Sequence, residues 1–351
     1  MTRKEERAAA ENTHGDASAP AVSVVVPAYN VARYLAEALE SVFAQTFKDF
    51  EVIVVNDGSP DTQELERVLA PYLTRVVYVK QENRGPSAAR NRGLAEARGR
   101  YVALLDADDV WLPEFLAEQT RALEAPPGLD LVYSDAVLFG EGDNVGRSFM
   151  ETCPSRGAVT VESLLAQTCV VITSCVVARR ASLVAAGLFD ERYRRSEDFQ
   201  LWVRMAHKGA RLGYQRKVLA RHRVRPDSLA GDASVMHECA LGVYADLSNE
   251  LEMTPRQRAI VETEIEKYES YLALARGKRA LADGEYERAA SELSRALSLQ
   301  RGPGLGGLKL RLALVCLRAA PRLARRFYLR RNVEGRAGRP REAKTDVGIT
   351  L

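Results

Sequence analysis

Short apolar runs rich in valine and isoleucine alternate with segments of helical periodicity from Val22 to about Val137. Alternation of this kind is typical of βαβ units, in which each helix returns the chain to the next parallel strand. The pattern predicts an α/β fold with a Rossmann-like, mainly parallel sheet. The expected strands are Val22–Val26, Phe50–Val55, Val76–Val79, Tyr101–Leu105 and Leu129–Tyr133.

The segment after the first expected strand predicts an amphipathic helix. Leu35, Ala38, Leu39 and Val42 recur at i, i+3, i+4 and i+7, which places them in one stripe for burial. Asn30 stands just before this segment, where a helix N-cap is expected.

Beyond about residue 240 the strand signal stops and a long helical pattern begins. Residues 280–297 resemble one tetratricopeptide unit, with small residues where two helices would cross and Gly284 in the turn. Because a solenoid needs about three repeats, one unit leaves two interpretations open. It is either a helical hairpin packed on the α/β domain or a module that binds a partner.

The composition indicates a soluble globular protein. Hydrophobic residues make up 46% and charged residues 28%, and no apolar run reaches the length of roughly 20 residues that spans a membrane. Residues 1–20 lack the apolar core of a secretory signal, so we expect a disordered lead-in and a cytoplasmic protein. We therefore expect four regions, with boundaries at 1–20, 21–240, 241–300 and 301–351.

The charge is unevenly distributed. Residues 305–331 contain eight Lys or Arg and no Asp or Glu, whereas the whole chain has a net charge of only +3. A nucleic-acid-binding protein would spread its positive charge along a groove, so we expect no nucleic-acid partner. A basic amphipathic end favours peripheral attachment to an anionic membrane surface; the alternative is a helix packed on the hairpin with its arginines solvated.

Polar clusters follow the expected strands, at the edge of a parallel sheet where ligands collect. Asp106, Asp108 and Asp109 come directly after an apolar strand, and such carboxylates suit Mg²⁺ or Mn²⁺ bound to a diphosphate. The alternative is an acidic cap for the next helix. Asp57 in Asn-Asp-Gly-Ser is either a hydrogen-bond acceptor for a nucleoside or an ordinary turn residue.

Two clusters follow later in the chain. Asp198 opens a predicted helix and is either a general base or an acid that complements the helix dipole. Residues 221–225 supply arginines for phosphate oxygens or form a solvated turn. His207 and His222 have no metal-site spacing, so we give them no role.

Five motifs, in their order along the chain, resemble those of the family 2 glycosyltransferases of the GT-A fold. The resemblance covers about Val22 to Leu229 and rests on Val-Ser-Val-Val-Val-Pro-Ala-Tyr-Asn, Val-Asn-Asp-Gly-Ser, Asn-Arg-Gly-Pro-Ser-Ala-Ala-Arg-Asn-x-Gly, Leu-Asp-Ala-Asp-Asp and Ser-Glu-Asp-Phe-Gln-Leu-Trp. It implies an inverting transfer of a hexose-type sugar from a nucleoside diphosphate sugar, usually a UDP-sugar. The acceptor would be a hydroxyl of a glycan, lipid-linked or other acceptor, as in polysaccharide or glycoconjugate synthesis.

The resemblance also implies residue roles. Asp198 would be the general base, Asp108 the principal metal ligand, and Asp106 a neighbour of both ribose and metal. The remaining nucleotide-sugar contacts would come from Pro27, Tyr29, Asp57, Gly85, Arg90, Asn91, Arg223 and Arg225.

One position departs from the family pattern, because Arg225 stands where histidine is frequent. A histidine there could assist a metal, whereas Arg225 could serve only the diphosphate. Two rival functions stay in view. The first is a catalytically silent scaffold that binds partners through the helical end, and the second is a nucleotidyltransferase, which would need a Gly-rich phosphate loop near the first strand.

Overall fold

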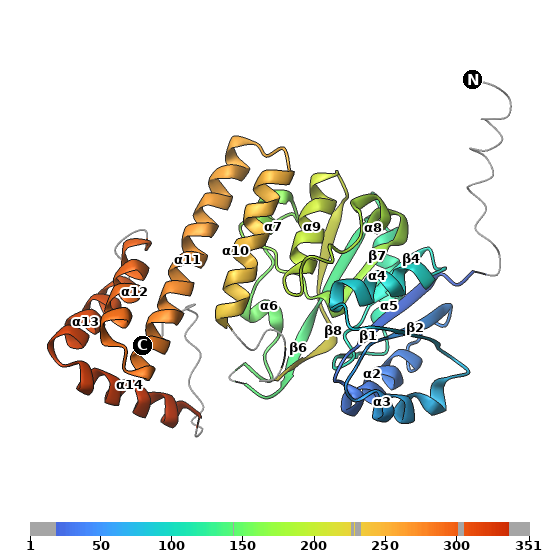
Figure 1. Cartoon of the computed structure of the whole chain (residues 1–351). Helices are drawn as coiled ribbons and strands as arrows, with labels where there is room; N and C mark the ends of the chain where they lie inside the picture. Colours follow the sequence, from blue (N-terminus) through green and yellow to red (C-terminus); the bar gives the residue numbers. More distant parts are fainter. Residues whose placement is uncertain (1–18, 143, 226–227, 229–232, 301–304, 337–351) are drawn as a thin grey trace. The chain divides into compact units, whose positions relative to one another are not determined.

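The computed structural model describes residues 19–142, 144–225, 228, 233–300 and 305–336 (Figure 1). The chain divides into two compact units. The first comprises Met1–Val137, Val171–Arg194 and Arg204–His222; the second comprises Leu138–Val170, Arg195–Val203 and Arg223–Leu351. The expected lead-in over residues 1–20 lies outside the described residues, apart from its last two positions.

An eight-stranded sheet forms the centre of the first unit, in the order β3-β2-β1-β4-β7-β6-β8-β5. All five strands expected from the sequence are present, and the α/β prediction is confirmed. Their ends are displaced by one or two residues, except that β6 continues to Gly140, well beyond the expected end at Tyr133. The strands are β1 Val22–Ala28, β2 Phe50–Asp57, β3 Val77–Gln81, β4 Tyr101–Leu104, β5 Val110–Trp111, β6 Leu131–Gly140, β7 Val176–Arg179 and β8 Leu212–Val224.

The half of the sheet that carries the expected site is parallel. Strand β1 pairs in parallel with β2 on one side and β4 on the other, and β2 pairs in parallel with β3. The carboxyl ends of β2, β1 and β4 are therefore neighbours at one edge. The other half is antiparallel, with β7 between β4 and β6 and with β5 on β8, which the strand pattern alone did not predict.

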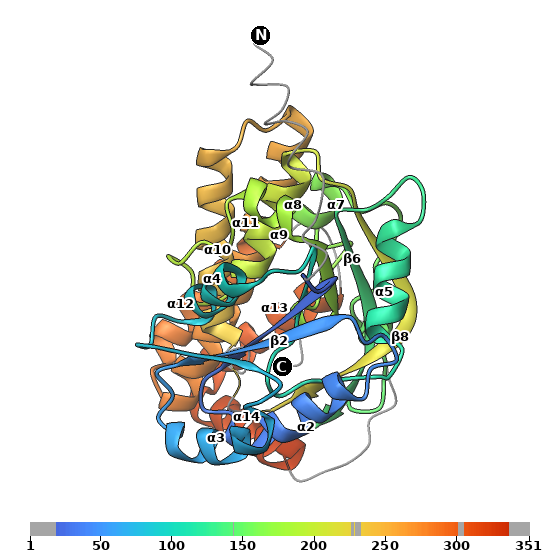
Figure 2. The same cartoon turned by 90° about the vertical axis from the view of Figure 1, so that its right-hand side faces the viewer.

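Helices cover both faces of the parallel strands (Figures 1 and 2). Helices α2 and α3 lie side by side on one face, and α4 packs against β1 and β2 on the other. Val24, Val25 and Val26 of β1 have no exposed surface, as a strand covered on both faces requires. The helices of this unit are α2 Ala32–Phe43, α3 Thr62–Leu69, α4 Pro86–Glu96, α5 Phe115–Glu124 and α8 Arg180–Ala186, with 3₁₀ turns η1 Ala70–Tyr72 and η2 Thr173–Cys175.

Helix α2 confirms the predicted stripe but corrects its cap. The four stripe residues are fully buried. The N-cap residue is Val31 rather than Asn30, and it gives no side-chain hydrogen bond. The carboxylate of Asp61, from the next loop, instead accepts a 2.9 Å hydrogen bond from the Ala32 backbone N–H. Ser59 Oγ likewise accepts one of 2.7 Å from the Asn30 N–H, so a distant loop satisfies this helix end.

The second unit is mainly helical. Its helices are α6 Phe149–Thr152, α7 Val161–Leu165, α10 Ala233–Glu250, α11 Pro255–Asp283, α12 Tyr286–Ser298, α13 Leu305–Ala319 and α14 Pro321–Arg336. The residues of α9 (Glu197–His207) are shared between the two units. Among the described residues, no helix is both long enough and apolar enough to cross a membrane.

The tetratricopeptide-like hairpin is formed by α11 and α12. Gly284 ends α11 in the left-handed conformation, with φ of 84°. The two helices lie so close at Gly277 that a Cβ there would be 2.8 Å from a Leu293 methyl carbon. Ser270 Oγ also donates a 3.0 Å hydrogen bond to the Ala296 carbonyl. Gly277 and Ser270, which precede the 280–297 pattern, therefore allow the close helix packing, and the small residues Ala280, Ala289 and Ala296 of the pattern are buried.

Candidate functional site

The sheet brings most of the predicted site residues to one edge of the first unit. Pro27 lies near the end of β1, Asp57 ends β2, and Asp106 follows β4. Because β1 lies between the other two strands, these positions are neighbours although they are far apart in the sequence. Tyr29, just past β1, is 48% exposed, which leaves its ring accessible to a ligand.

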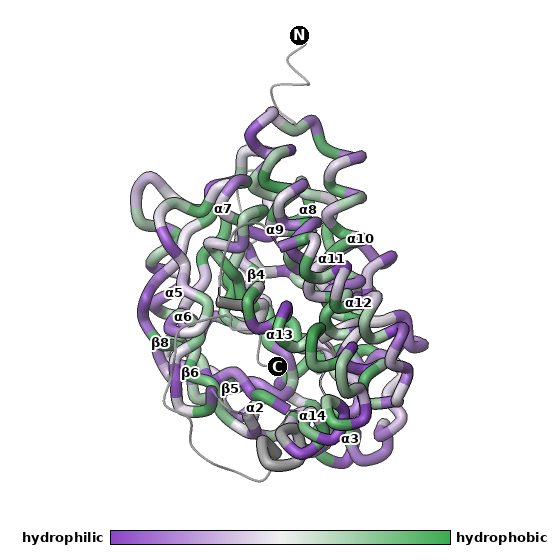
Figure 3. Tube along the Cα trace, turned by 90° about the vertical axis from the view of Figure 1, so that its left-hand side faces the viewer, coloured by the Kyte–Doolittle hydropathy of each residue, from purple (hydrophilic) through white to green (hydrophobic). Residues whose placement is uncertain are grey.

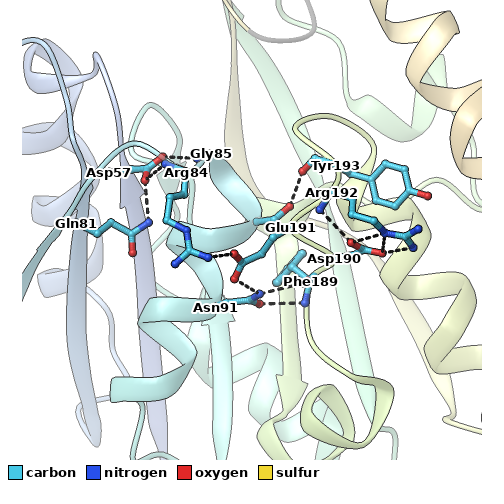
Figure 4. Close-up of polar contacts among 11 residues, drawn as sticks. Asp57, Gln81, Arg84, Gly85, Asn91, Phe189, Asp190, Glu191, Arg192 and Tyr193 are labelled. Atoms are coloured by element: carbon cyan, nitrogen blue, oxygen red, sulfur yellow. Dashed lines mark hydrogen bonds and ion pairs between the residues drawn. The ribbon is translucent and has the colours of Figure 1, made fainter.

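Asp57 is a buried acceptor that organises the loop after β3. Its Oδ1 accepts hydrogen bonds from the Arg84 backbone N–H at 2.9 Å and from the Gln81 side-chain amide at 2.8 Å. Its Oδ2 accepts a 2.8 Å bond from the Gly85 N–H (Figure 4). One carboxylate therefore fixes the Gln81 side chain at the end of β3 and the backbone of Arg84 and Gly85 after it. The nucleoside contact expected of Asp57 stays a prediction.

Two glycines allow this loop to form. Gly58 has a φ of 61°, and a Cβ at this position would lie 2.6 Å from the backbone nitrogen of Asn83. Gly85 has a φ of 92° and is the N-cap of α4, followed by Pro86 at the first helical position. Both conformations are costly for residues with a side chain, so the positive φ angles explain why glycine occupies these two positions.

Asn91 ties α4 to the loop after α8 (Figure 4). Its amide nitrogen donates to the Phe189 carbonyl at 2.8 Å, and its amide oxygen accepts from the Phe189 N–H at 3.0 Å. Glu191 from the same loop pairs with Arg84 at 2.5 Å. Ser87 donates to the Tyr193 carbonyl at 2.7 Å. These contacts show that Asn91 joins α4 to the loop after α8, and the nucleotide-sugar contact expected of it stays a prediction.

Arg90 forms an ion pair with Asp106. The two side chains meet at 2.6 Å, with the arginine side chain 6% exposed and the aspartate 32% exposed. The guanidinium carbon also lies 5.5 Å from the ring centre of Phe189. Ser174 Oγ accepts a 3.1 Å hydrogen bond from the Asp106 N–H, which fixes the backbone where the acidic motif begins. Arg90 thereby orients one carboxylate of that motif.

His222 is a component of the acidic motif that sequence reasoning missed. Its Nδ1 lies 2.9 Å from Asp109 Oδ2, and the Asp109 side chain is only 1% exposed. Burial opposes protonation of the imidazole, but the negative charges of Asp109, Asp106 and Asp108 outweigh it and raise the pKa of His222 to about 9. Their sequence separation of 113 residues hid the pair, and no spacing rule connects them.

The acidic motif fits a divalent cation of the kind held jointly by protein and substrate. Within the described residues no cluster of three or more His, Cys, Asp or Glu side chains could enclose an ion. Asp106 and Asp108 are both partly exposed, whereas Asp109 is buried against His222. One or two accessible carboxylates, completed by water and phosphate oxygens, are a common arrangement for Mg²⁺. The donor set therefore fits such an ion.

The remaining predicted residues belong to the second unit. Asp198 lies in the first turn of α9, half-buried, and its Oδ1 accepts a 2.7 Å hydrogen bond from the Phe199 N–H. The Arg223 guanidinium carbon lies 4.2 Å from the ring centre of Phe139, which holds that side chain against an aromatic face. Arg225 directly follows β8 and is half-buried. The roles expected for all three stay predictions.

Comparison with known proteins identifies the family. The family model described as "Glycosyl transferase family 2" matches residues 23–184. An uncharacterized glycosyltransferase of Methanocaldococcus jannaschii is 30% identical over 215 residues, covering 60% of this chain and 73% of that protein. The amylovoran biosynthesis glycosyltransferase AmsB of Erwinia amylovora is 32% identical over 194 residues, covering 52% and 62%. The chain spans only 45% of a longer Rickettsia conorii relative.

Two solved structures share the fold. TarS of S. aureus, residues 1–349 in complex with UDP-GlcNAc, has a TM-score of 0.57 at 20% identity, covering 90% of this chain and 92% of that one. The mannosyltransferase PcManGT of Pyrobaculum calidifontis, in complex with GDP-Man and Mn²⁺, has a TM-score of 0.57 at 20% identity, covering 94% and 93%. The sheet, the ordered motifs and these relatives agree, and the chain belongs to glycosyltransferase family 2 with the GT-A fold.

Proposed function

We propose that this glycosyltransferase moves a sugar from a nucleoside diphosphate sugar to a hydroxyl of a glycan, lipid-linked or other acceptor. The observation that carries the proposal is the gathering of Asp57, the Arg90–Asp106 pair and Asp108 at the carboxyl ends of β2, β1 and β4. An edge with accessible carboxylates beside ordered backbone suits a nucleotide and its phosphates. The names of the relatives favour polysaccharide or glycoconjugate synthesis as the setting.

The nucleoside occupies the first part of this edge. The exposed ring of Tyr29 offers a surface for the base, and Pro27 lies beside it at the end of β1. Asp57 at the end of β2 orders the backbone at Gly85 beside it, and Asn91 of α4 holds the loop after α8. The bound nucleotides of the structural neighbours are UDP-GlcNAc and GDP-Man, and we propose a UDP-sugar as the first donor to test.

The diphosphate lies next to the acidic motif. Asp108 and Asp106 would hold a divalent cation, which, when bound, offsets charge on the departing diphosphate. Arg90 keeps Asp106 oriented through their ion pair. Arg223 and Arg225 supply further cations for phosphate oxygens, for which the planar guanidinium group is well suited.

Asp198 is the proposed general base. It removes the proton from the acceptor hydroxyl as that oxygen attacks the anomeric carbon of the sugar. The new glycosidic bond forms as the bond to the diphosphate oxygen breaks, and attack from the opposite face inverts the anomeric configuration. Nucleoside diphosphate is the second product, and the proton remains on Asp198 until solvent takes it.

The reaction is assigned to the region 21–240, with the helices of 241–300 and the tail of 301–351 as an appendage. A hairpin of the α11–α12 type could also bind a partner, which keeps the silent scaffold as the alternative function. The scaffold would bind its partners without releasing nucleoside diphosphate. Product release therefore distinguishes the two functions.

The test is a panel of UDP- and GDP-sugars with Mn²⁺, Mg²⁺ or chelator, read by release of nucleoside diphosphate. We expect Asp198→Asn to lower kcat by about 100-fold or more, since general bases contribute this much. Asp49→Asn is the matched control, because Asp49 is an exposed carboxylate before β2 and outside the proposed site. If none of the donors yields nucleoside diphosphate, the scaffold function is favoured. An unchanged kcat in Asp198→Asn would show that Asp198 is not the general base.

A further inference from the structure

The last two helices expose large apolar side chains to solvent. Val315 of α13 is 64% exposed, and Leu323 and Phe327 of α14 are 68% and 67% exposed. Leu308 and Leu312 of α13 are exposed to a similar degree. Leu308, Leu312 and Val315 are spaced at i, i+4 and i+7, so they lie along one side of their helix. A chain that needed these side chains only for its own core would bury them.

The opposite side of α13 already forms that core. Leu310, Leu314 and Leu317 are buried and pack with Leu293 and Ala296 of α12. Helix α13 thus has one apolar side that holds it on the hairpin and a second that stays exposed. Packing of this helix on the hairpin, with its arginines in solvent, explains the buried side of α13. It does not explain why the other side exposes large apolar residues.

Cations accompany the exposed apolar side chains. In the tube of Figure 3 the hydrophilic and hydrophobic residues alternate along α13 and α14. No Asp or Glu occurs from residue 305 to 331 to balance this charge. The exposed cations among the described residues of the two helices are Lys309, Arg311, Arg318, Arg322, Arg326 and Arg330.

Three kinds of partner could cover such a surface, and its chemistry separates them. The phosphates of a nucleic acid would pair with the cations, but a nucleic acid would provide little apolar surface to cover Leu308 or Leu312. A second copy of the chain would bury the leucines but would bring two sets of arginines together with no acids between them. A bilayer with anionic lipids matches both, because apolar side chains enter the headgroup boundary while guanidinium groups meet the phosphates.

We propose that α13 and α14 form a docking surface for an anionic lipid bilayer, with Leu308, Leu312, Val315, Leu323 and Phe327 entering the interface. The two helices then lie on the membrane surface. This goes beyond glycosyl transfer and is independent of it, since vesicle binding needs neither donor nor acceptor. Its failure would leave the proposed reaction untouched.

The experiment is co-sedimentation of the full chain with vesicles of phosphatidylcholine, with and without phosphatidylglycerol. We expect binding to the anionic vesicles that weakens with added salt, and little binding to the neutral ones. Leu312→Ser combined with Phe327→Ser should lower the partition coefficient about tenfold or more, because both lose an apolar side chain from the interface. Arg322→Glu combined with Arg326→Glu should do the same through charge.

The matched control is Val184→Ser in α8, which removes a side chain 56% exposed and outside the surface. It should bind vesicles as the parent does. Because every substituted side chain is exposed, the melting temperature should stay close to that of the parent in all variants. Equal binding to both vesicle types, or undiminished binding by the leucine and phenylalanine variant, would overturn the proposal. So would a dimer in sedimentation equilibrium that this variant dissociates, since a second copy would then be the occupant.

Discussion

The imidazole of His222 and the buried carboxylate of Asp109 form an ion pair, with Nδ1 and Oδ2 separated by 2.9 Å. Arg90 pairs with Asp106 in the same motif at 2.6 Å. Asp106 and Asp109 thus each have a cationic partner within the protein. These ion pairs place cations beside closely spaced carboxylates at one edge of the sheet, which reduces the electrostatic repulsion between them.

The ion pair predicts a stability that depends on pH. The pKa of His222 is about 9 in the folded protein, compared with 6.5 for an ordinary histidine. Protonated His222 therefore stabilises the fold fully below pH 6.5, and this contribution is lost as pH rises through 9. With the imidazole one-third exposed, His222→Gln should lower the free energy of unfolding by about 1–3 kcal/mol at pH 6. Urea unfolding from pH 6 to 9.5 measures it.

The difference between the parent and His222→Gln should shrink steadily across that range. His207→Gln provides the control, because His207 ends α9 and has no part in the acidic motif. A difference that stays constant from pH 6 to 9.5 would show that the imidazole stabilises the fold by packing rather than by charge.

Asp57→Asn tests the loop after β3. An asparagine keeps one acceptor oxygen, so its NH₂ group must face either the Gly85 N–H or the N–H groups of Arg84 and Gln81. A buried N–H then loses its partner, and we expect the free energy of unfolding to fall by about 1–3 kcal/mol. The KM for the donor should rise as the loop loosens, whereas Asp49→Asn should change neither quantity. Steady-state kinetics with varied donor give the KM, and denaturant unfolding curves give the free energy of unfolding. If Asp57→Asn has wild-type values for both quantities, Asp57 does not organise the loop.

Gly58→Ala tests the tight approach of two loops. The Cβ of the new alanine would lie 2.6 Å from the Asn83 backbone nitrogen, and the alanine must also adopt a φ of 61°. Gly157→Ala is matched, since Gly157 has a φ of 72° but open space around its Cβ position. We expect about 1 kcal/mol of destabilisation for Gly157→Ala and at least about 2 kcal/mol for Gly58→Ala. Equal losses in thermal unfolding would mean that the φ angle, and not the contact, requires glycine.

Gly277→Ala tests the crossing of α11 and α12. The added Cβ lies 2.8 Å from a methyl carbon of Leu293, so the helices or that side chain must shift, at a cost of about 1–3 kcal/mol. Gly242→Ala in α10 meets nothing within 4 Å. It should stabilise the protein by up to about 1 kcal/mol through helix propensity alone. Chemical denaturation should therefore give a lower free energy of unfolding for Gly277→Ala and a higher one for Gly242→Ala. Stabilisation by both substitutions would contradict the close crossing of α11 and α12.

The sequence alone determined the elements that depend on local pattern. Valine-rich runs predicted β1 to β4, and the spacing of Leu35, Ala38, Leu39 and Val42 predicted the buried side of α2. Periodicity is sufficient here because the spacing of apolar residues within one segment determines which of them share the buried face of a helix or strand. The order of the polar clusters also indicated the family and the edge of the sheet where the candidate site lies.

Tertiary structure decided what depends on residues distant in the chain. Asp61 rather than Asn30 satisfies the start of α2, and His222 pairs with Asp109 across 113 residues. Both outcomes require the sheet to bring separate loops together, and no local spacing encodes that proximity. The antiparallel strands β7 and β8 follow the same logic, since strand direction is set by the path of the chain between strands. Local sequence specifies which residues can do chemistry, and the assembled sheet specifies which of them meet.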